Sequence, residues 1–328
     1  MSRAMARVAA RWSRLALPSA PCARSSHGLT VLGKQAFVFG GEHVPRRSIN
    51  TTLHCLDMGG GKPSWSMLHH AKCPPARVGH AQTAVDGKLF VFGGRTGVDM
   101  GETALDDLWS FCPVKSAWRQ LSAGSPPSAR SFHASAAAGS KLYVFGGCGA
   151  GVRLADLHEF DTASGAWKQL PSPPEVAGRG GATLEASADG RYLWLMCGFA
   201  GHETDDLLRF CLASHTWERR PSEWLRPRSV CASFTTCRGV FLFGGEVSAS
   251  AQGHEGAGSF ASDLIGIHPQ DGTPLSVVVE GETDAAPVAR GWAAAAALSD
   301  SQAVLFGGLA GTDEAPQRLD DAWLLSLD

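Results

Sequence analysis

The residues best suited to chemistry lie in one polar loop that occurs only once in the chain. Glu246 and His254 stand at its two ends, in Glu246-Val-Ser-Ala-Ser250-Ala-Gln-Gly-His254. A carboxylate and an imidazole that converge on a cavity mouth could hold a divalent metal such as Fe(II). Such a cation usually takes three protein ligands, so the spacing alone also allows a loop stabilised by its own hydrogen bonds.

Two arginines form the second set of candidates. Arg95 and Arg153 lie in loops that follow apolar strands, and neither belongs to the arginines that recur in each repeat. A surface rich in arginine and poor in acid attracts sulfate, phosphate or carboxylate. The recurring set has a structural alternative, in which each arginine bonds to neighbouring carbonyls and acids; it consists of Arg24, Arg77, Arg130, Arg179, Arg228 and Arg290.

The composition excludes several classes of function. Charged residues make up 18% of the 328 residues and the net charge is -2, which favours neither nucleic acid nor an anionic membrane. No apolar run approaches the roughly 20 residues that span a bilayer. The nine cysteines include no C-x-x-C pair, which argues against a disulfide framework or a thiolate zinc site and favours a reducing compartment.

A repeat of about 50 residues organises the chain. An apolar strand that ends in Gly-Gly occurs at 37–41, 90–94, 143–147, 241–245 and 304–308, with a degenerate copy at 194–198. Each unit also has a small-residue strand before the diglycine, an acid that leads a third strand, and in most units a tryptophan on a fourth strand. Four short strands in each of six units predict an all-β fold, a six-bladed kelch β-propeller with four antiparallel strands per blade.

The two ends of the chain are expected to close the ring. The last unit has its second strand at Val304 and its third at 322–327, but no fourth strand. Arg11-Trp12-Ser-Arg-Leu15 has the character of that missing strand, so we predict that it completes the last blade. Residues 1–9 then form a short extension and 10–328 a single domain. The basic start weakly resembles a transit peptide, but the expected role of Trp12 disfavours organelle targeting, and we expect a cytoplasmic, or cytoplasmic and nuclear, protein.

Strand direction assigns the candidate residues to one face. In an antiparallel four-stranded blade, the start of the first strand and the loop after the second strand lie on the same side. The residues after the diglycines, among them Glu42, Arg95, Cys148 and Glu246, are therefore expected beside the starts of the first strands.

Several local stretches are more distinctive than the repeat itself. They are Arg24-Ser-Ser-His-Gly28, Phe92-Gly-Gly-Arg95, Ala129-Arg-Ser-Phe-His133, Arg179-Gly-Gly-Ala182, Gly244-Gly-Glu-Val247 with Gly253-His254, and Ala289-Arg-Gly-Trp292. These stretches resemble the plant epithiospecifier, nitrile-specifier and thiocyanate-forming proteins. The resemblance runs from about Trp12 to the C-terminus and keeps the order of the blades. It is therefore more specific than the kelch repeat alone, which is a scaffold with many functions.

The resemblance implies an Fe(II)-dependent protein that directs a glucosinolate aglycone, a thiohydroximate O-sulfate, toward nitriles. The family's iron motif, E-x-x-x-D-x-x-x-H, falls on Glu246, Ser250 and His254, so a serine replaces the central carboxylate. Its catalytic arginines fall on Arg95 and Arg153.

The family's pocket aromatics fall on Phe132 and Trp292. The alternative function is a non-catalytic kelch scaffold that holds a protein or peptide partner on the arginine-bearing face. The expected partners are accordingly a small sulfated molecule or a protein, and neither nucleic acid nor membrane.

Overall fold

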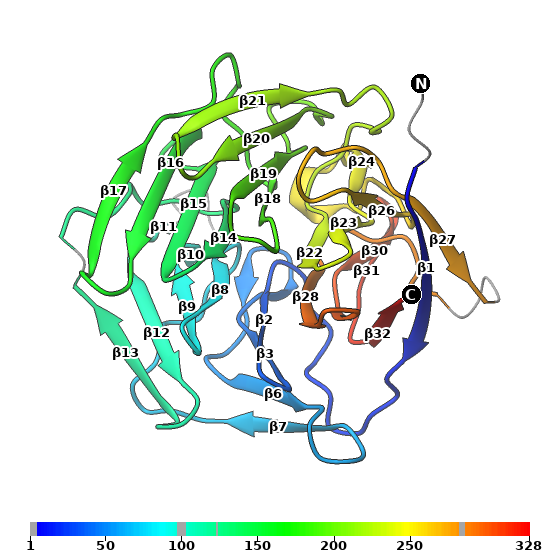
Figure 1. Cartoon of the computed structure of the whole chain (residues 1–328). Coiled ribbons are helices and arrows are strands. Elements are labelled where there is room, and N and C mark those ends of the chain that lie inside the picture. The colour runs from blue at the N-terminus through cyan, green and yellow to red at the C-terminus, as the bar shows by residue number, and fades with distance from the viewer. Residues whose placement is uncertain (1–4, 97–102, 123, 282–285) are drawn as a thin grey trace.

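Six β-sheet blades surround a central axis in the computed structural model (Figure 1). The structure describes residues 5–96, 103–122, 124–281 and 286–328, except for the side chain of residue 254. None of the helices in this part of the chain is long and apolar enough to cross a membrane. All nine cysteines are free thiols.

Blades 1 to 4 are four-stranded antiparallel sheets in which the first strand of each unit is innermost. Blade 1 consists of β2 (Gly28–Leu32), β3 (Gln35–Phe39), β6 (Leu53–Asp57) and β7 (Ser64–Leu68). Blade 2 consists of β8 (Ala81–Val85), β9 (Lys88–Phe92), β12 (Leu108–Cys112) and β13 (Ala117–Leu121). Blade 3 consists of β14 (Ala134–Ala138), β15 (Lys141–Cys148), β16 (Arg153–Asp161) and β17 (Ala166–Leu170). Blade 4 consists of β18 (Thr183–Ala186), β19 (Tyr192–Met196), β20 (Leu207–Cys211) and β21 (Thr216–Arg220).

Blade 5 has three strands in its sheet, and blade 6 has five. Blade 5 has β22 (Ala232–Thr236), β23 (Gly239–Phe243) and β26 (Leu264–Ile267) in one sheet. Blade 6 has β28 (Ala294–Ser299), β29 (Gln302–Phe306), β32 (Ala322–Leu327) and the N-terminal β1 (Arg7–Arg14). By its order in the chain, β27 (Ser276–Glu280) would be the fourth strand of blade 5, but it pairs in parallel with β1. This pairing is possible because β1 has two edges. One edge pairs with β32 through residues 10–14, and the other pairs with β27 through residues 7–11.

The predicted closure of the ring by the N-terminus is confirmed. Trp12 pairs with Leu325 of β32, and its ring lies 5.1 Å from Phe243 of blade 5. Trp118 of blade 2 relates in the same way to Phe39 of blade 1, at 5.5 Å. Trp12 therefore acts as the interblade tryptophan of blade 6. The strand begins at Arg7, so residues 7–9 belong to the propeller rather than to the predicted extension, because they pair with β27.

The recurring arginines are structural. Arg77 is fully buried and donates to Gly93 O at 2.8 Å and to both oxygens of Asp107 at 2.7 Å. The same pairing recurs as Arg130–Asp156, Arg179–Asp206, Arg228–Asp263 and Arg290–Asp321. Arg24 differs, because Thr52 stands where the other blades have the aspartate, and its guanidinium bonds to Gly40 O at 3.0 Å. These buried guanidiniums fasten each diglycine turn and are not available to a ligand.

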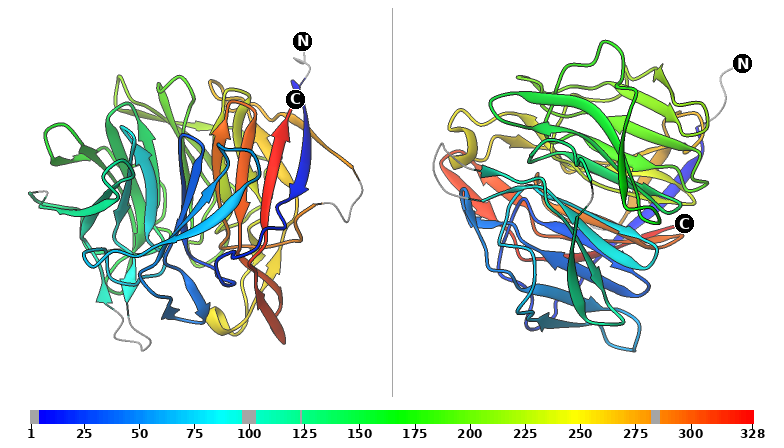
Figure 2. Two further views of the ribbon diagram at one scale, coloured as in Figure 1. Left: turned by 90° about the horizontal axis from the view of Figure 1, so that it is seen from below. Right: turned by 90° about the vertical axis from the view of Figure 1, so that its left-hand side faces the viewer.

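Short hairpins follow the diglycines and lie on one face. They are β4 (Glu42–Val44) with β5 (Arg47–Ser48), β10 (Arg95–Thr96) with β11 (Thr103–Ala104), β24 (Glu246–Ser248) with β25 (Ser259–Phe260), and β30 (Leu309–Thr312) with β31 (Ala315–Arg318). The 3-10 helix η1 (Gly253–Glu255) lies between β24 and β25. Figure 2 shows η1 in yellow and the β30–β31 hairpin in dark red on the side opposite the two termini.

Candidate functional site

A ring of six backbone hydrogen bonds forms the floor of the site. The second residue after each recurring arginine has a left-handed backbone and donates its N–H to the carbonyl of its equivalent in the preceding blade; these residues are Ser26, Gly79, Phe132, Gly181, Val230 and Trp292. The donor–acceptor distances range from 2.6 Å for Phe132 to Gly79 up to 3.0 Å at several positions, and Ser26 closes the ring onto Trp292. Closure of the ring thus requires a positive φ in every blade.

Three residues with large side chains adopt this unfavourable left-handed backbone conformation. Phe132, Val230 and Trp292 have φ values of 52°, 50° and 49°, which cost an L-residue about 1 kcal/mol each. Glycines at the intervening positions make room for them, because a Cβ on Gly79 would lie 2.9 Å from the Phe132 ring and one on Gly181 would lie 2.6 Å from Val230. All three line a pocket of about 300 Å³, which is the size of a small-molecule site. Strain tolerated where side chains enter a pocket is typical of a functional site.

Arginine and aromatic side chains form one wall of the pocket. Arg153 lines it and stacks over Phe199, with 4.8 Å from its guanidinium carbon to the ring centre. Arg95 lies 5.0 Å from the ring centre of Phe132. Burial raises the pKa of the Cys148 thiol between them, while Arg153 and Arg95 oppose that change. This wall carries positive charge over apolar ring faces, which suits an anion attached to a small organic group.

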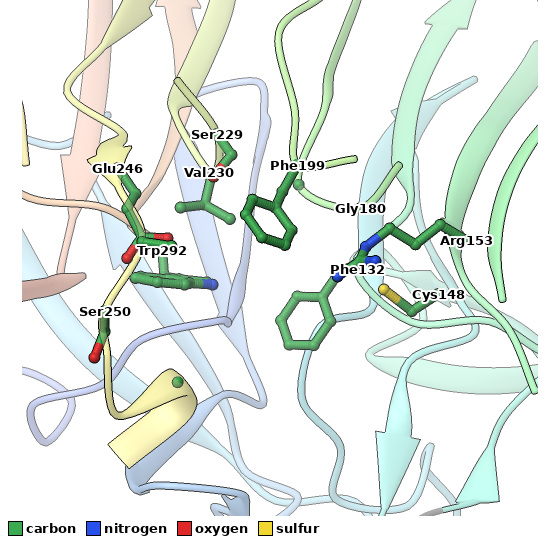
Figure 3. Close-up of a pocket in the computed structure, with 13 residues that line it drawn as sticks. Phe132, Cys148, Arg153, Gly180, Phe199, Ser229, Val230, Glu246, Ser250 and Trp292 are labelled. Atoms are coloured by element: carbon green, nitrogen blue, oxygen red, sulfur yellow. The ribbon is translucent and has the colours of Figure 1, made fainter. Parts of the chain in front are cut away.

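A carboxylate lies on the opposite wall (Figure 3). Glu246 is 6% exposed and lines the pocket. Burial raises its pKa to about 7, the charge of Glu203 adds to this, the backbone N–H of Ser250 opposes it, and Asp313 adds a smaller increase. Among the described residues the pocket is thus polarised, with guanidinium on one side and carboxylate on the other.

The loop after Glu246 is held by an acid from the next blade. Ser250 Oγ donates to Asp313 Oδ1 at 2.5 Å, and Ala257 N donates to the same oxygen at 3.0 Å. Ala251 N donates to Asp313 Oδ2 at 3.1 Å. These bonds lower the pKa of Asp313, with the Ser250 hydroxyl as the largest contributor. The serine hydroxyl therefore serves as a donor to Asp313, and Asp313 fixes the loop of blade 5 against blade 6.

The structure brings most of the predicted site residues together. Phe132, Arg153, Glu246, Ser250 and Trp292 line one pocket, and Arg95 adjoins it through Phe132.

The side chain of His254 lies outside the described part, although its backbone is in η1. Within the described part, no group of three His, Cys, Asp or Glu side chains is arranged to hold a metal.

Four residues that contribute to the site were not predicted from the sequence. Phe199 follows the degenerate Cys-Gly exactly where Glu246 follows its diglycine, and Val230 occupies the position of Phe132 and Trp292 relative to the arginine. Both could have been found by aligning the repeats. Glu203 and Asp313 carry no such signal, because they lie between the second and third main strands of blades 4 and 6, in connections that differ from blade to blade.

Comparison with known proteins agrees with this architecture. The family model described as the KLHDC2/KLHL20/DRC7 Kelch-repeats domain matches residues 26–245. The chain belongs to the kelch-repeat family. The solved structure of YjhT is superimposable with a TM-score of 0.76 at 18% identity, over 95% of this chain and 99% of that one, which supports the propeller fold.

Two plant relatives match this chain over different shares of their own length. N-(sulfonatooxy)prop-2-enimidothioate sulfolyase of Thlaspi arvense is 28% identical over 309 residues, 84% of each chain. Putative adagio-like protein 2 of Oryza sativa subsp. japonica is 32% identical over 200 residues, which are 58% of this chain and 31% of that protein. The kelch chain thus matches the sulfolyase over most of its length and the adagio-like protein over less than a third.

Proposed function

We propose that the pocket binds a small thiohydroximate O-sulfate of the glucosinolate type and directs its breakdown to a nitrile. The observation that carries this proposal is the position of Arg153, stacked on Phe199 and facing an apolar floor. The name of the Thlaspi relative describes a lyase that acts on a sulfonatooxy imidothioate, which has the same combination of an anion and a small apolar group.

The chemistry assigned to these side chains follows from the charge that develops. When the N–O bond breaks, sulfate leaves with the bonding electron pair. The C–S bond breaks as well, its electron pair becomes the third C–N bond of the nitrile, and the thiolate sulfur leaves as elemental sulfur. Donors that face the departing oxygen stabilise this charge more in the transition state than in the substrate. Arg153 provides these hydrogen-bond donors, and the positive charge of Arg95 adds to their effect. Phe132 and Trp292 hold the organic group.

Iron is implied by the resemblance, but the described side chains do not fit it well. Glu246 offers one carboxylate, the Ser250 hydroxyl is engaged by Asp313, and the described residues contain no converging group of three ligands. Glu246 and His254 remain the residues proposed to contact Fe(II), and no step of the mechanism is assigned to the metal. Dependence on Fe(II) is therefore one variable of the experiment.

The test measures product distribution. The purified protein is incubated with a thioglucosidase and an aliphatic glucosinolate, with and without Fe(II), and nitrile is measured against isothiocyanate. We expect a nitrile fraction above that of the iron-only control, and a fall of about 100-fold in nitrile-forming rate for Arg153→Gln. Arg153→Lys should retain part of the rate, because it keeps the charge but not the planar stacking.

A matched control separates the site from the scaffold. Arg191 is 64% exposed in the turn before β19, outside the pocket, so Arg191→Gln should leave the product ratio unchanged. A nitrile fraction equal to the iron-only control in the wild type would remove this function.

A second candidate is recognition of a protein partner on the hairpin-bearing face. The family match favours it, because the same repeats occur as a small part of longer proteins, such as the dynein alpha chain of Chlamydomonas reinhardtii, where the match covers 3% of that chain. If no nitrile is formed while the protein is folded, this scaffold function is the one to pursue.

A further inference from the structure

A second cavity lies on the propeller axis, deeper than the pocket floor. It has a volume of about 300 Å³ and is lined by the inner strands of all six blades, β2, β8, β14, β18, β22 and β28. Figure 1 shows these strands around the axis. A further opening shares Val31, Ala137 and Thr235 with this cavity and continues to the hairpins at residues 33 and 187–188. Small ions therefore have a route into the channel from the face opposite the pocket.

One side chain on this lining is ionisable. Among the described lining residues Glu185 is the only acid, and none is a lysine, arginine or histidine. Ser233 Oγ donates to one of its oxygens at 2.7 Å, and Thr235 Oγ1 donates to the other at 2.9 Å. Burial raises the pKa of Glu185 to about 7, and the two hydroxyl groups oppose that change. Glu185 is partly exposed, and a carboxylate with such limited access to water is unfavourable unless a positive charge or a proton accompanies it.

A hydroxyl group lies across the axis from Glu185 with no hydrogen-bond partner among the described residues. With six blades, blade 1 is opposite blade 4, and Thr30 of blade 1 lines the channel with 4% exposure. Its Oγ1 has no hydrogen-bond partner within the described residues. Gln82 of blade 2 also lines the channel, but its Nε2 donates to Phe37 O at 2.8 Å and its side chain interacts with His80. Hydroxyl, amide and carboxylate oxygens are the ligands that hard cations prefer.

We propose that the axial channel binds one monovalent cation, Na⁺ or K⁺, between Glu185 and the neutral oxygens of the inner strands. The single carboxylate matches a single positive charge, and the neutral oxygens replace water around the ion. A divalent ion such as Mg²⁺ gives up its water reluctantly, and one carboxylate offers it little in return. The bound ion stabilises the ring by joining strands from opposite sides of the axis.

The test compares thermal unfolding in NaCl, KCl and tetramethylammonium chloride at equal ionic strength and mildly alkaline pH. We expect the melting temperature of the wild type to be higher by about 2 °C or more in Na⁺ or K⁺, because these ions bind only the folded state. Glu185→Gln has nearly the same shape without the charge, so this difference should disappear. Glu223 is exposed outside the channel, and Glu223→Gln should keep the wild-type difference.

Sodium NMR relaxation of the wild type provides a second measurement that does not depend on a variant. Protein-dependent relaxation that K⁺ competes away supports the site. Equal melting temperatures in the three salts would overturn it, as would a cation effect that survives in Glu185→Gln. Stabilisation by Ca²⁺ or Mg²⁺ alone would refute the monovalent assignment. Stabilisation on acidification, without any cation effect, would show that Glu185 holds a proton instead.

Discussion

His80 offers a quantitative test of how the blades pack. Its ring lies between blades 1 and 2, edge-on to Phe39 at 5.7 Å, and a Cβ on Gly40 would lie 2.7 Å from its Cε1. Burial lowers its pKa from 6.5 to about 3, and the charge of Arg77 adds to that effect. The folded protein therefore keeps His80 neutral at pH values at which the unfolded chain protonates it. The free energy of unfolding falls as the pH drops below the pKa that His80 has in the unfolded chain.

The size of this effect follows from the two pKa values. Between about pH 7 and pH 5, His80 alone should reduce the free energy of unfolding by about 2 kcal/mol. His27 and His133 act in the same direction, since burial lowers the pKa of both. Glu185 and Glu246 act in the opposite direction, because their raised pKa values favour proton uptake by the folded state. The wild-type pH dependence is thus a sum of opposing contributions.

A variant isolates the contribution of His80. Urea unfolding is measured at both pH values for the wild type, for His80→Gln and for His202→Gln, an exposed histidine that serves as control. The change in unfolding free energy between the two pH values should be smaller by about 2 kcal/mol in His80→Gln, and unaltered in the control. If His80→Gln and the wild type have the same pH dependence, the imidazole is not held neutral between the blades.

Two further predictions concern the joins between blades. Deletion of residues 1–14 removes Trp12 and leaves one edge of β32 unpaired. The melting temperature, measured by circular dichroism, should therefore fall by about 10 °C or more. A deletion variant that melts at the temperature of the full-length protein would contradict closure by this strand. Asp313→Asn should accelerate amide hydrogen exchange at Ala251 and Ala257 by about tenfold while global melting changes little, because it weakens bonds to a carboxylate in a part-exposed loop. Unchanged protection of both amides would show that Asp313 does not hold the loop.

The fold could be predicted because its determinants repeat. The diglycine, the leading acid and the tryptophan recur at fixed offsets, and each offset corresponds to one place in a blade. The closure by Trp12 followed from the absence of one strand at the end of the chain. The placement of β27 could not be predicted, because it depends on which edge of β1 remains open once β1 has paired with β32.

Only part of the candidate site could be predicted from the sequence. Strand direction placed Arg95 and Glu246 on one face, and the observed pairing of Val78 with Arg95 and Ser229 with Glu246 confirms that arrangement. The assignments of Phe132 and Trp292 rested on resemblance, and the structure adds the reason for their positions, a closed hydrogen-bond ring with positive φ.

The sequence by itself determined the number of blades, their order, the shared face of the loops and the strand that closes the ring. These properties depend on local patterns and on counting strands. Only the tertiary structure decided which loops of adjacent blades touch, as Asp313 touches Ser250 and as Arg318 touches Glu42 at 3.5 Å. Such contacts join residues far apart in the chain, in hairpins and loops where no periodic pattern specifies a partner. The polar loop from Glu246 is therefore defined as much by blade 6 as by its own residues.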